Sequence, residues 1–314
     1  MGKKFTIGVL IGNVHTAHPK DLMRGIRAAA SGMDVNMIYF LGTQSVRFNQ
    51  KFALEDFDYQ YNTVYDYAKL AKVDVLIIAY GSLCIFQENE DKQAFLDKFA
   101  GIPYVLLEDA TDDPRGIYVM VDNYGGMQKC VEHLIIEHHL KHLVYLGGPE
   151  DNQDAIERKA AFLNVMAEHH LPVTPEMMAV GDYSEFVDNL VEQLLRDNPD
   201  AEAIISANDE MTVACYRVCK AHGLRIGKDI LITGFDDVER ARYSNPPLTT
   251  VSQDAYKMGQ IAVEKAVDIC AGRPVESVRL DAELIIRESC GCKVTRRAKE
   301  KADERDIEEQ LVKH

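Results

Sequence analysis

Short apolar runs alternate with longer amphipathic stretches along most of this chain. The apolar runs are Phe5–Ile11, Val35–Phe40, Val73–Ala79, Tyr104–Leu107, His142–Leu146, Met178–Val180, Ala203–Ser206 and Ile230–Thr233. Between them lie stretches with helical periodicity, among them Pro19–Ser31, Gly125–His138, Ala155–His169, Glu210–His222 and Tyr256–Ala271. Nearly continuous apolar strands separated by helices are typical of parallel sheets covered on both faces. The pattern predicts an α/β fold, and because the runs are too many for one ordinary sheet, it predicts two doubly wound domains.

Length and composition agree with that expectation and limit the function. A chain of 314 residues is long enough for roughly two domains of about 150 residues. Hydrophobic residues make up 46% and charged residues 27%, which is ordinary for a globular protein. The formal net charge of −15 repels phosphate backbones, so we do not expect this chain itself to bind nucleic acid. No apolar run approaches about 18 residues, so we expect no membrane span.

The cysteines and histidines predict no metal site and no cofactor. The seven cysteines are odd in number and mostly lie in apolar segments, which favours free thiols in a reducing cytoplasm. Cys290 and Cys292 could hold a metal or form a redox pair, but two thiols without further ligands nearby make a poor site. Six histidines lack metal-ligand spacing and are interpreted as structural: His133, His138, His139, His142, His169 and His170. Met1 leads into the first apolar run without a signal-peptide pattern, which also favours the cytoplasm.

Two adjacent carboxylates follow the apolar run that ends at Thr233. Gly234 and Phe235 lead directly into Asp236 and Asp237, which places both carboxylates at the carboxyl end of a predicted strand. In open α/β sheets, ligands bind at this end. Adjacent residues of an extended segment point to opposite faces, so the pair is not expected to share one substrate bond. Motifs of hydrolases, P-loop proteins, zinc proteases and dinucleotide-binding enzymes are missing, and we predict no catalytic residues.

Several segments occur in an order that resembles the LacI/GalR (lactose-repressor) family of sugar-responsive regulators. They include Gly234-Phe-Asp-Asp237, Val121-Asp-Asn-Tyr-Gly-Gly126, Ala207-Asn-Asp-Glu-Met211, Pro246-Pro-Leu-Thr-Thr-Val251 and Ile286-Arg-Glu-Ser289. The resemblance covers about residues 5–289. It implies two Rossmann-like lobes with parallel sheets, a ligand cleft between them and three crossing strands. Carried onto this chain, it implies an N-terminal lobe of 1–137 plus 255–281 and a C-terminal lobe of 138–254 plus 282–292. Family members pair side by side, so a homodimer is also implied.

The resemblance also implies a set of residues that bind a sugar-like effector. In the family, the first Asp of the Gly-Phe-Asp-Asp motif, here Asp236, hydrogen-bonds the effector. Asp236 supplies acceptors, while the planar guanidinium of Arg158 supplies donors suited to vicinal hydroxyls or a carboxylate. Asn208 offers a donor and an acceptor, and Tyr183 offers a ring on which a sugar can stack. The C-terminal lobe is expected to contribute these four residues, and the N-terminal lobe to contribute Asn13, His15, Tyr80, Glu108 and Tyr124. The glycines at 125–126 are expected to leave backbone N–H groups open to the effector. Asp209 is interpreted as a helix N-cap beside the site.

The chain departs from the family at both ends and in its first loop. The family's helix-turn-helix and hinge helix are not seen, because Met1 lies only a few residues before the first strand. The first loop carries His15-Thr-Ala-His18-Pro19 where the family usually has Asn-Pro-Phe-Phe. Residues 293–314 are mostly charged and are expected to form an exposed helix or linker. This ending resembles sensors joined to an output module after His314, such as a diguanylate cyclase or an AraC-type DNA-binding domain.

The resulting hypothesis is a cytoplasmic sensor of a sugar or related metabolite, whose lobes reorient on binding and pass that change to an output module. Two alternatives from other classes stay open. One is a transport-type solute-binding protein of the same fold, which would need a leader sequence. The other is a sugar- or nucleoside-processing enzyme on a two-lobed scaffold, which no residue constellation supports. The sequence does not identify the ligand.

Overall fold

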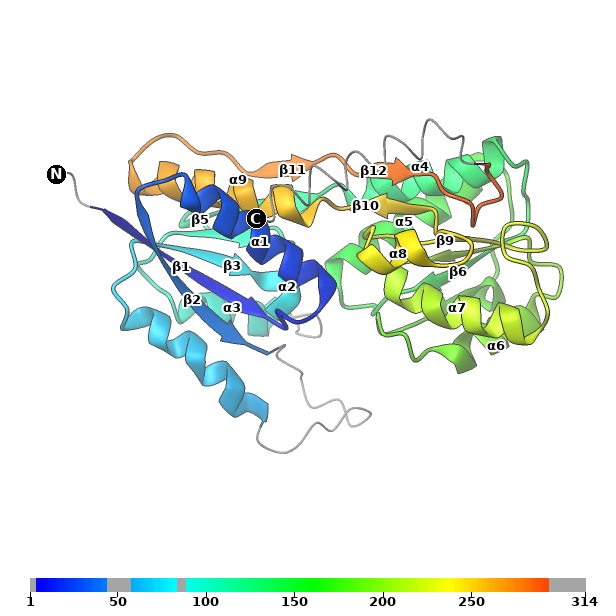
Figure 1. Ribbon diagram of the computed structural model, residues 1–314, viewed down its shortest axis with the longest axis horizontal. Helices are drawn as coiled ribbons and strands as arrows, with labels where there is room; N and C mark the ends of the chain where they lie inside the picture. Colours follow the sequence, from blue (N-terminus) through cyan, green and yellow to red (C-terminus); the bar gives the residue numbers. More distant parts are fainter. Residues whose placement is uncertain (1–3, 44–57, 84–88, 294–314) are drawn as a thin grey trace. The chain divides into compact units, whose positions relative to one another are not determined.

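The computed structural model describes residues 4–43, 58–83 and 89–293 of the chain (Figure 1). These residues form two compact units, each made of three chain segments. Within the described residues, the first unit draws on 4–126, 149–161 and 253–282, and the second draws on 127–148, 162–252 and 283–293. The expected tail helix at 294–314 lies outside the described residues.

The first unit is built on a six-stranded parallel sheet with the order β11-β5-β4-β3-β1-β2. Its strands are β1 (Phe5–Gly12), β2 (Val35–Gly42), β3 (Val75–Ala79), β4 (Tyr104–Leu107), β5 (Gly116–Val121) and β11 (Val278–Leu280). The chain runs from β1 outward to β2 and then returns to β3 on the other side of β1. The topology therefore changes direction between β1 and β3, where doubly wound sheets bind ligands beyond the strand ends.

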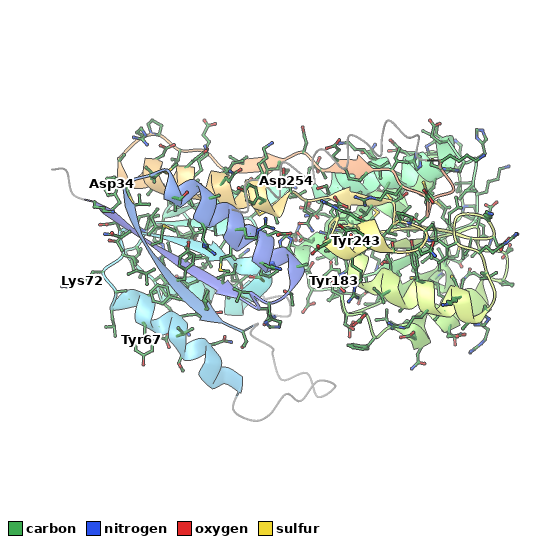
Figure 2. The ribbon with its side chains drawn as sticks, viewed as in Figure 1. Asp34, Tyr67, Lys72, Tyr183, Tyr243 and Asp254 are labelled. Carbon is green, nitrogen blue, oxygen red and sulfur yellow. The ribbon has the colours of Figure 1, made fainter. Side chains whose placement is uncertain are left out.

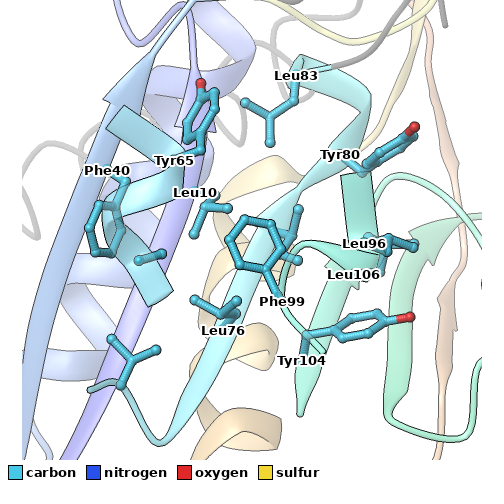
Figure 3. Packing of buried hydrophobic residues seen from close by; sticks show 13 residues of the cluster. Leu10, Phe40, Tyr65, Leu76, Tyr80, Leu83, Leu96, Phe99, Tyr104 and Leu106 are labelled. Carbon is cyan, nitrogen blue, oxygen red and sulfur yellow. The ribbon is translucent and has the colours of Figure 1, made fainter. Parts of the chain in front are cut away.

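Helices cover both faces of this sheet. One face carries α1 (Ala17–Ser31) and α9 (Ala255–Cys270), which pack closely because glycines stand at their crossing. A Cβ on Gly25 would lie 1.9 Å from the Tyr256 carbonyl oxygen, and a Cβ on Gly259 would lie 2.3 Å from that of Leu22. The other face packs against the 3₁₀ helix η1 (Asp58–Lys69) and α3 (Asn89–Asp97). Figure 3 shows this second core, in which Phe40, Phe99 and Tyr104 surround leucines of the sheet. A short helix, α2 (Tyr80–Leu83), follows β3.

The second unit is built on a four-stranded parallel sheet with the order β7-β6-β8-β9. Its strands are β6 (Leu143–Gly147), β7 (Met178–Val180), β8 (Ala203–Ser206) and β9 (Leu231–Thr233). Here the topology changes direction between β6 and β8. A separate antiparallel pair is formed by β10 (Thr250–Ser252) and β12 (Glu283–Ile285).

Helices and one 3₁₀ turn accompany the strands of the second unit. The helices are α6 (Asp188–Asp197), α7 (Asp209–Ala221), α8 (Glu239–Tyr243) and the 3₁₀ turn η2 (Pro175–Met177). Two longer helices carry residues of both units: α4 (Asn123–Ile136) and α5 (Gln153–Glu168). In the second unit, α5 contributes Phe162, whose ring stacks on Tyr145 of β6 with centroids 4.9 Å apart. From α4, Met127, Cys130, Val131 and Leu134 are fully buried.

The structure confirms the predicted fold class of parallel-sheet α/β architecture. It groups two segments differently from the expected lobes: 127–137 belongs to the second unit and 149–161 to the first. The buried side chains of α4 explain the first difference, and the contacts of Arg158 described below explain the second. The sequence did not predict β5, β10 or β11. Among the described residues, no helix is long and apolar enough to cross a membrane.

Candidate functional site

In the first unit, most of the predicted binding residues follow the carboxyl ends of neighbouring strands. Asn13 follows β1, Tyr80 follows β3, Glu108 follows β4 and Tyr124 lies in the first turn of α4 after β5. The register of the parallel ladder places these strand ends side by side at one edge of the sheet. The order of the strands thus brings together residues that lie far apart in the sequence.

Glu108 is fixed by contacts on both carboxylate oxygens. Oε2 accepts a hydrogen bond from the Ser82 backbone N–H at 3.0 Å, and Oε1 is in close contact with Nε2 of His18. Glu108 is buried and adopts a φ of 68°, a left-handed conformation that non-glycine residues seldom adopt. His18 was not among the predicted binding residues, although it belongs to the divergent segment His15–Pro19; in the structure it lies in the first turn of α1.

Arg158 lies in a buried polar group with two residues that the prediction missed. Its Nε donates to Oδ1 of Asn123 at 2.8 Å, and its guanidinium lies 3.6 Å from Oδ2 of Asp154. Asn123 closes the group by donating to Oδ1 of Asp154 at 2.8 Å. Arg158 is only 2% exposed, and its partners belong to the first unit. The expectation that it comes from the C-terminal lobe therefore does not match its contacts. The four-residue spacing of Asp154 and Arg158 on one helix was the available signal.

The other first-unit residues differ in exposure. Tyr80 is buried and joins the core cluster, with its ring 6.2 Å from that of Phe95. Tyr124 is half-buried, while His15 is exposed. The expectation of open N–H groups at the start of α4 is wrong. The Gly125 N–H donates to Oδ1 of Asp122, and the Gly126 N–H donates to the Asp122 carbonyl.

In the second unit, Asn208 stands where the topology changes direction, directly after β8 and its neighbour Ala207. It is the N-cap of α7: Oδ1 accepts from the Met211 N–H at 3.0 Å, and Nδ2 donates to the Tyr183 carbonyl at 3.1 Å. The interpretation of Asp209 as this cap is wrong, because Asp209 is already the first helical residue. Asn208 therefore joins the helix start to the loop that carries Tyr183.

Asp209 is a buried carboxylate that the sequence did not place in the site. It is 2% exposed and accepts hydrogen bonds from the Thr250 hydroxyl at 2.6 Å and from the Val238 N–H at 3.0 Å. Burial, and then the negative charge of Asp236, raise the pKa of Asp209 well above its ordinary value. Asp209 therefore links the start of α7 to the segments that carry Val238 and Thr250.

Tyr183 and Asp236 lie beyond the ends of β7 and β9. Tyr183, which is labelled in Figure 2, has a φ of 66°. A Cβ on Gly148 would lie 2.3 Å from its ring. Asp236 has a φ of 122°, and its N–H donates to the Val251 carbonyl at 2.7 Å. Its neighbour Asp237 instead forms ion pairs with Arg287 at 2.7 Å and with Arg242 at 3.5 Å. Asp237 also has a positive φ, 54°, so the extended backbone assumed for this pair in the sequence-based prediction is not what the structure shows.

The sequence profile of the periplasmic binding protein-like domain matches residues 131–290, more than half of the chain. The chain belongs to this family. A curated relative, the HTH-type transcriptional regulator CelR of Thermobifida fusca, is 30% identical over 218 residues. That match covers 67% of this chain and 63% of the relative, so the chain spans less than two thirds of that regulator's length.

Two solved structures show the same fold as this periplasmic binding protein-like domain. A CelR–cellobiose complex has a TM-score of 0.75 at 24% identity, over 91% of this chain and 85% of that chain. The Lac repressor dimer bound to operator and the anti-inducer ONPF has a TM-score of 0.76 at 23% identity, over 92% and 82%. The resemblance to lactose-repressor-type regulators is thereby confirmed.

One expectation for this domain is wrong: Cys290 and Cys292 do have further ligand-type side chains nearby. His133 and His138, whose sequence spacing was interpreted as structural, lie beside them in the second unit. One ligand atom from each of the four residues lies within 4.8 Å of all the others. Sequence spacing gave no signal because about 150 residues separate the two pairs, and only the fold brings them together.

Proposed function

We propose that this chain binds a small polyhydroxylated effector through residues at the carboxyl ends of its parallel strands. The observation that carries the proposal is a set of left-handed backbone conformations at those ends. Asn13, Glu108, Tyr183 and Asp236 have φ values of 49°, 68°, 66° and 122°, and each follows a strand. Such conformations cost about 1–3 kcal/mol each and concentrate at functional sites.

The chemistry of these strand ends suits a neutral, hydroxyl-rich ligand. Arg158 and His18 bring nitrogen donors in the first unit, while Asp236 brings carboxylate acceptors in the second. Hydroxyl groups both donate and accept, so a sugar can use both kinds of partner. The related regulator CelR has been solved in complex with cellobiose, a sugar, which supports the same ligand class here.

Regulation of transcription is the output that the relatives favour. The curated relatives are named as HTH-type transcriptional regulators or repressors, which gives no support to a catalytic output such as a diguanylate cyclase. We infer that the whole protein acts on DNA through a part other than this acidic domain. The predicted lobe reorientation, homodimer and binding residues His15, Tyr80, Asn208 and Tyr124 belong to the same proposal. Sedimentation of the purified chain would test the homodimer.

The test is thermal unfolding against a panel of sugars, sugar phosphates, nucleosides and purines. An effector present at 100 times its Kd should add about 2.7 kcal/mol of stability, which shifts Tm by a few degrees. Asp236→Asn should abolish that shift with little change in the Tm of the ligand-free chain. Glu239→Gln is the control, because it changes an exposed carboxylate a few residues away. A panel without any hit, or a shift that survives in Asp236→Asn, contradicts the proposal.

A further inference from the structure

Two pairs of ligand-type residues meet at the end of α4 in the second unit. His133 lies in the last turn of this helix and His138 follows just after it. Cys290 and Cys292 lie beyond β12, in the segment that ends the described part of the chain. Cys290 is fully buried, His133 is 9% exposed, and His138 and Cys292 are partly buried. We call these four residues the His/Cys cluster.

The spacing of their ligand atoms fits a tetrahedron around one metal ion. Zinc bonds of about 2.0–2.1 Å to nitrogen and about 2.3 Å to sulfur imply edges of about 3.3 Å for N–N and about 3.6 Å for N–S. The two Nε2 atoms of His133 and His138 lie 3.3 Å apart. The N–S distances are 3.5 Å for His133–Cys290, 3.7 Å for His133–Cys292 and 3.4 Å for His138–Cys292. Ordinary packing does not require all these distances to match a single coordination sphere.

Backbone features hold the two pairs in position. The Glu137 N–H donates to the His133 carbonyl just beyond the end of the helix, and His139, next to His138, has a left-handed φ of 57°. Gly291, between the two cysteines, has a φ of 85°, which favours glycine. A Cβ at Gly291 would also lie 3.2 Å from the Gly227 carbonyl oxygen and 3.8 Å from the His138 ring. The Cys-Gly-Cys turn therefore depends on a glycine at its centre.

Neighbouring polar groups support a sulfur ligand at Cys290. The Thr249 hydroxyl donates to Cys290 Sγ at 3.1 Å, and the Arg287 N–H donates to the same hydroxyl oxygen at 2.8 Å. Hydrogen bonds of this kind orient and stabilise metal-bound ligands. The Cys290 thiol also contacts the Arg287 carbonyl at 3.4 Å, a hydrogen bond that would be lost on ligation.

We propose that the His/Cys cluster is a structural Zn²⁺ site. Two imidazoles and two thiolates are a ligand set that selects zinc in tetrahedral geometry, and four protein ligands leave no open position for catalysis. The metal would tie the Cys-Gly-Cys turn to the end of α4, two segments that lie far apart in the sequence. The proposal is independent of the effector, since its residues are separate from those at the strand ends.

The first experiment measures metal content in the full chain, purified without a polyhistidine tag and under reducing conditions. We expect one zinc ion per chain by mass spectrometry, and a metal-stripped chain titrated with Co²⁺ should show the visible bands of tetrahedral cobalt with a sulfur-to-cobalt charge-transfer band. A chain that stays without metal after reconstitution with Zn²⁺, or a Cys290–Cys292 disulfide under these conditions, overturns the proposal. An octahedral cobalt spectrum also overturns it.

Variants separate ligation from general packing. Cys292→Ser and His138→Gln change partly buried ligands and should each lose the charge-transfer intensity or stoichiometric zinc. Cys270→Ser and His169→Gln are matched controls outside the cluster and should keep both. If either ligand variant fails to fold, as judged by circular dichroism, the other supplies the test. Wild-type zinc stoichiometry in a folded ligand variant contradicts the assignment.

The Thr249 hydroxyl gives a finer measurement. Thr249→Val should weaken zinc affinity about 10-fold in competition with a chromophoric chelator, because supporting contacts of this kind contribute about 10–100-fold. Thr249→Ser keeps the hydroxyl and should restore most of that affinity. Equal affinity in the Val variant would show that the hydroxyl does not support the metal.

Discussion

The two units hold their candidate binding residues by different means. In the first unit, polar side chains hold one another: Arg158 pairs with Asn123 and Asp154, and Glu108 contacts His18. In the second unit, the backbone does most of this work, through the Asn208 cap, the bonds to Asp209 and the Asp236 N–H. We therefore expect a single side-chain substitution to lower the stability of the first unit more than that of the second.

The largest effect on stability is expected for Arg158→Ala. Removing one partner of a buried charged group leaves the others without compensation, which costs about 3 kcal/mol. Urea denaturation at neutral pH measures this loss. The matched control is Lys159→Ala on the same helix: its side chain is 38% exposed, and the change should stay within about 0.5 kcal/mol. A loss below about 1 kcal/mol for Arg158→Ala would show that the first unit does not depend on these side-chain contacts more than the second unit does.

An intermediate effect is expected for Asp209, which should make the stability of the folded chain depend on pH. Its pKa is raised in the folded state by burial and by Asp236, so its contribution to stability is complete below the unfolded pKa of about 4. That contribution is lost as the pH rises through the folded pKa. Asp209→Asn should therefore flatten the fall in stability that begins as the pH rises above the unfolded pKa of about 4.

Stability curves recorded across this pH range check the Asp209 prediction. Asp112→Asn, which changes an exposed carboxylate of the first unit, should keep the wild-type profile. If Asp209→Asn has the same slope as the wild type, burial does not control this carboxyl group.

The sequence predicted the parallel sheets well because buried strands need nearly unbroken apolar runs. Met178–Val180 and Ala203–Ser206 were placed at their observed bounds. It missed β5, although five of its six residues are apolar. It also missed β10 and β11, which are three residues long and partly polar, so their pairing depends on tertiary contacts. The location of Asn208 and Asp236 shortly after strands was predictable from the apolar runs, whereas their assignment to the site rested on the family resemblance and stays a prediction.

The partners of those residues could not be predicted in the same way. Asn123 and Asp209 look like ordinary helix-start residues in the sequence, and only the fold shows that each is buried against a charged or polar group. The same limit applies to His133 and Cys290, which are brought together by packing over a long sequence separation. Local patterns therefore identify positions, whereas the contacts that give those positions their chemistry come from the topology.

The smallest loss of stability is expected for substitutions of Asn208 in the second unit. Asn208→Ala removes the N-cap of α7 and should cost about 1 kcal/mol. Asn208→Ser loses the hydrogen bond to the Tyr183 carbonyl but keeps an acceptor for the Met211 N–H. Because the cap is kept, the Ser variant should retain most of the wild-type stability in urea denaturation. A Ser variant as unstable as the Ala variant would show that the bond to the Tyr183 loop, and not the cap, holds this part of the second unit. In that case both units would depend on side-chain hydrogen bonds, and they would differ only in how much stability these bonds contribute.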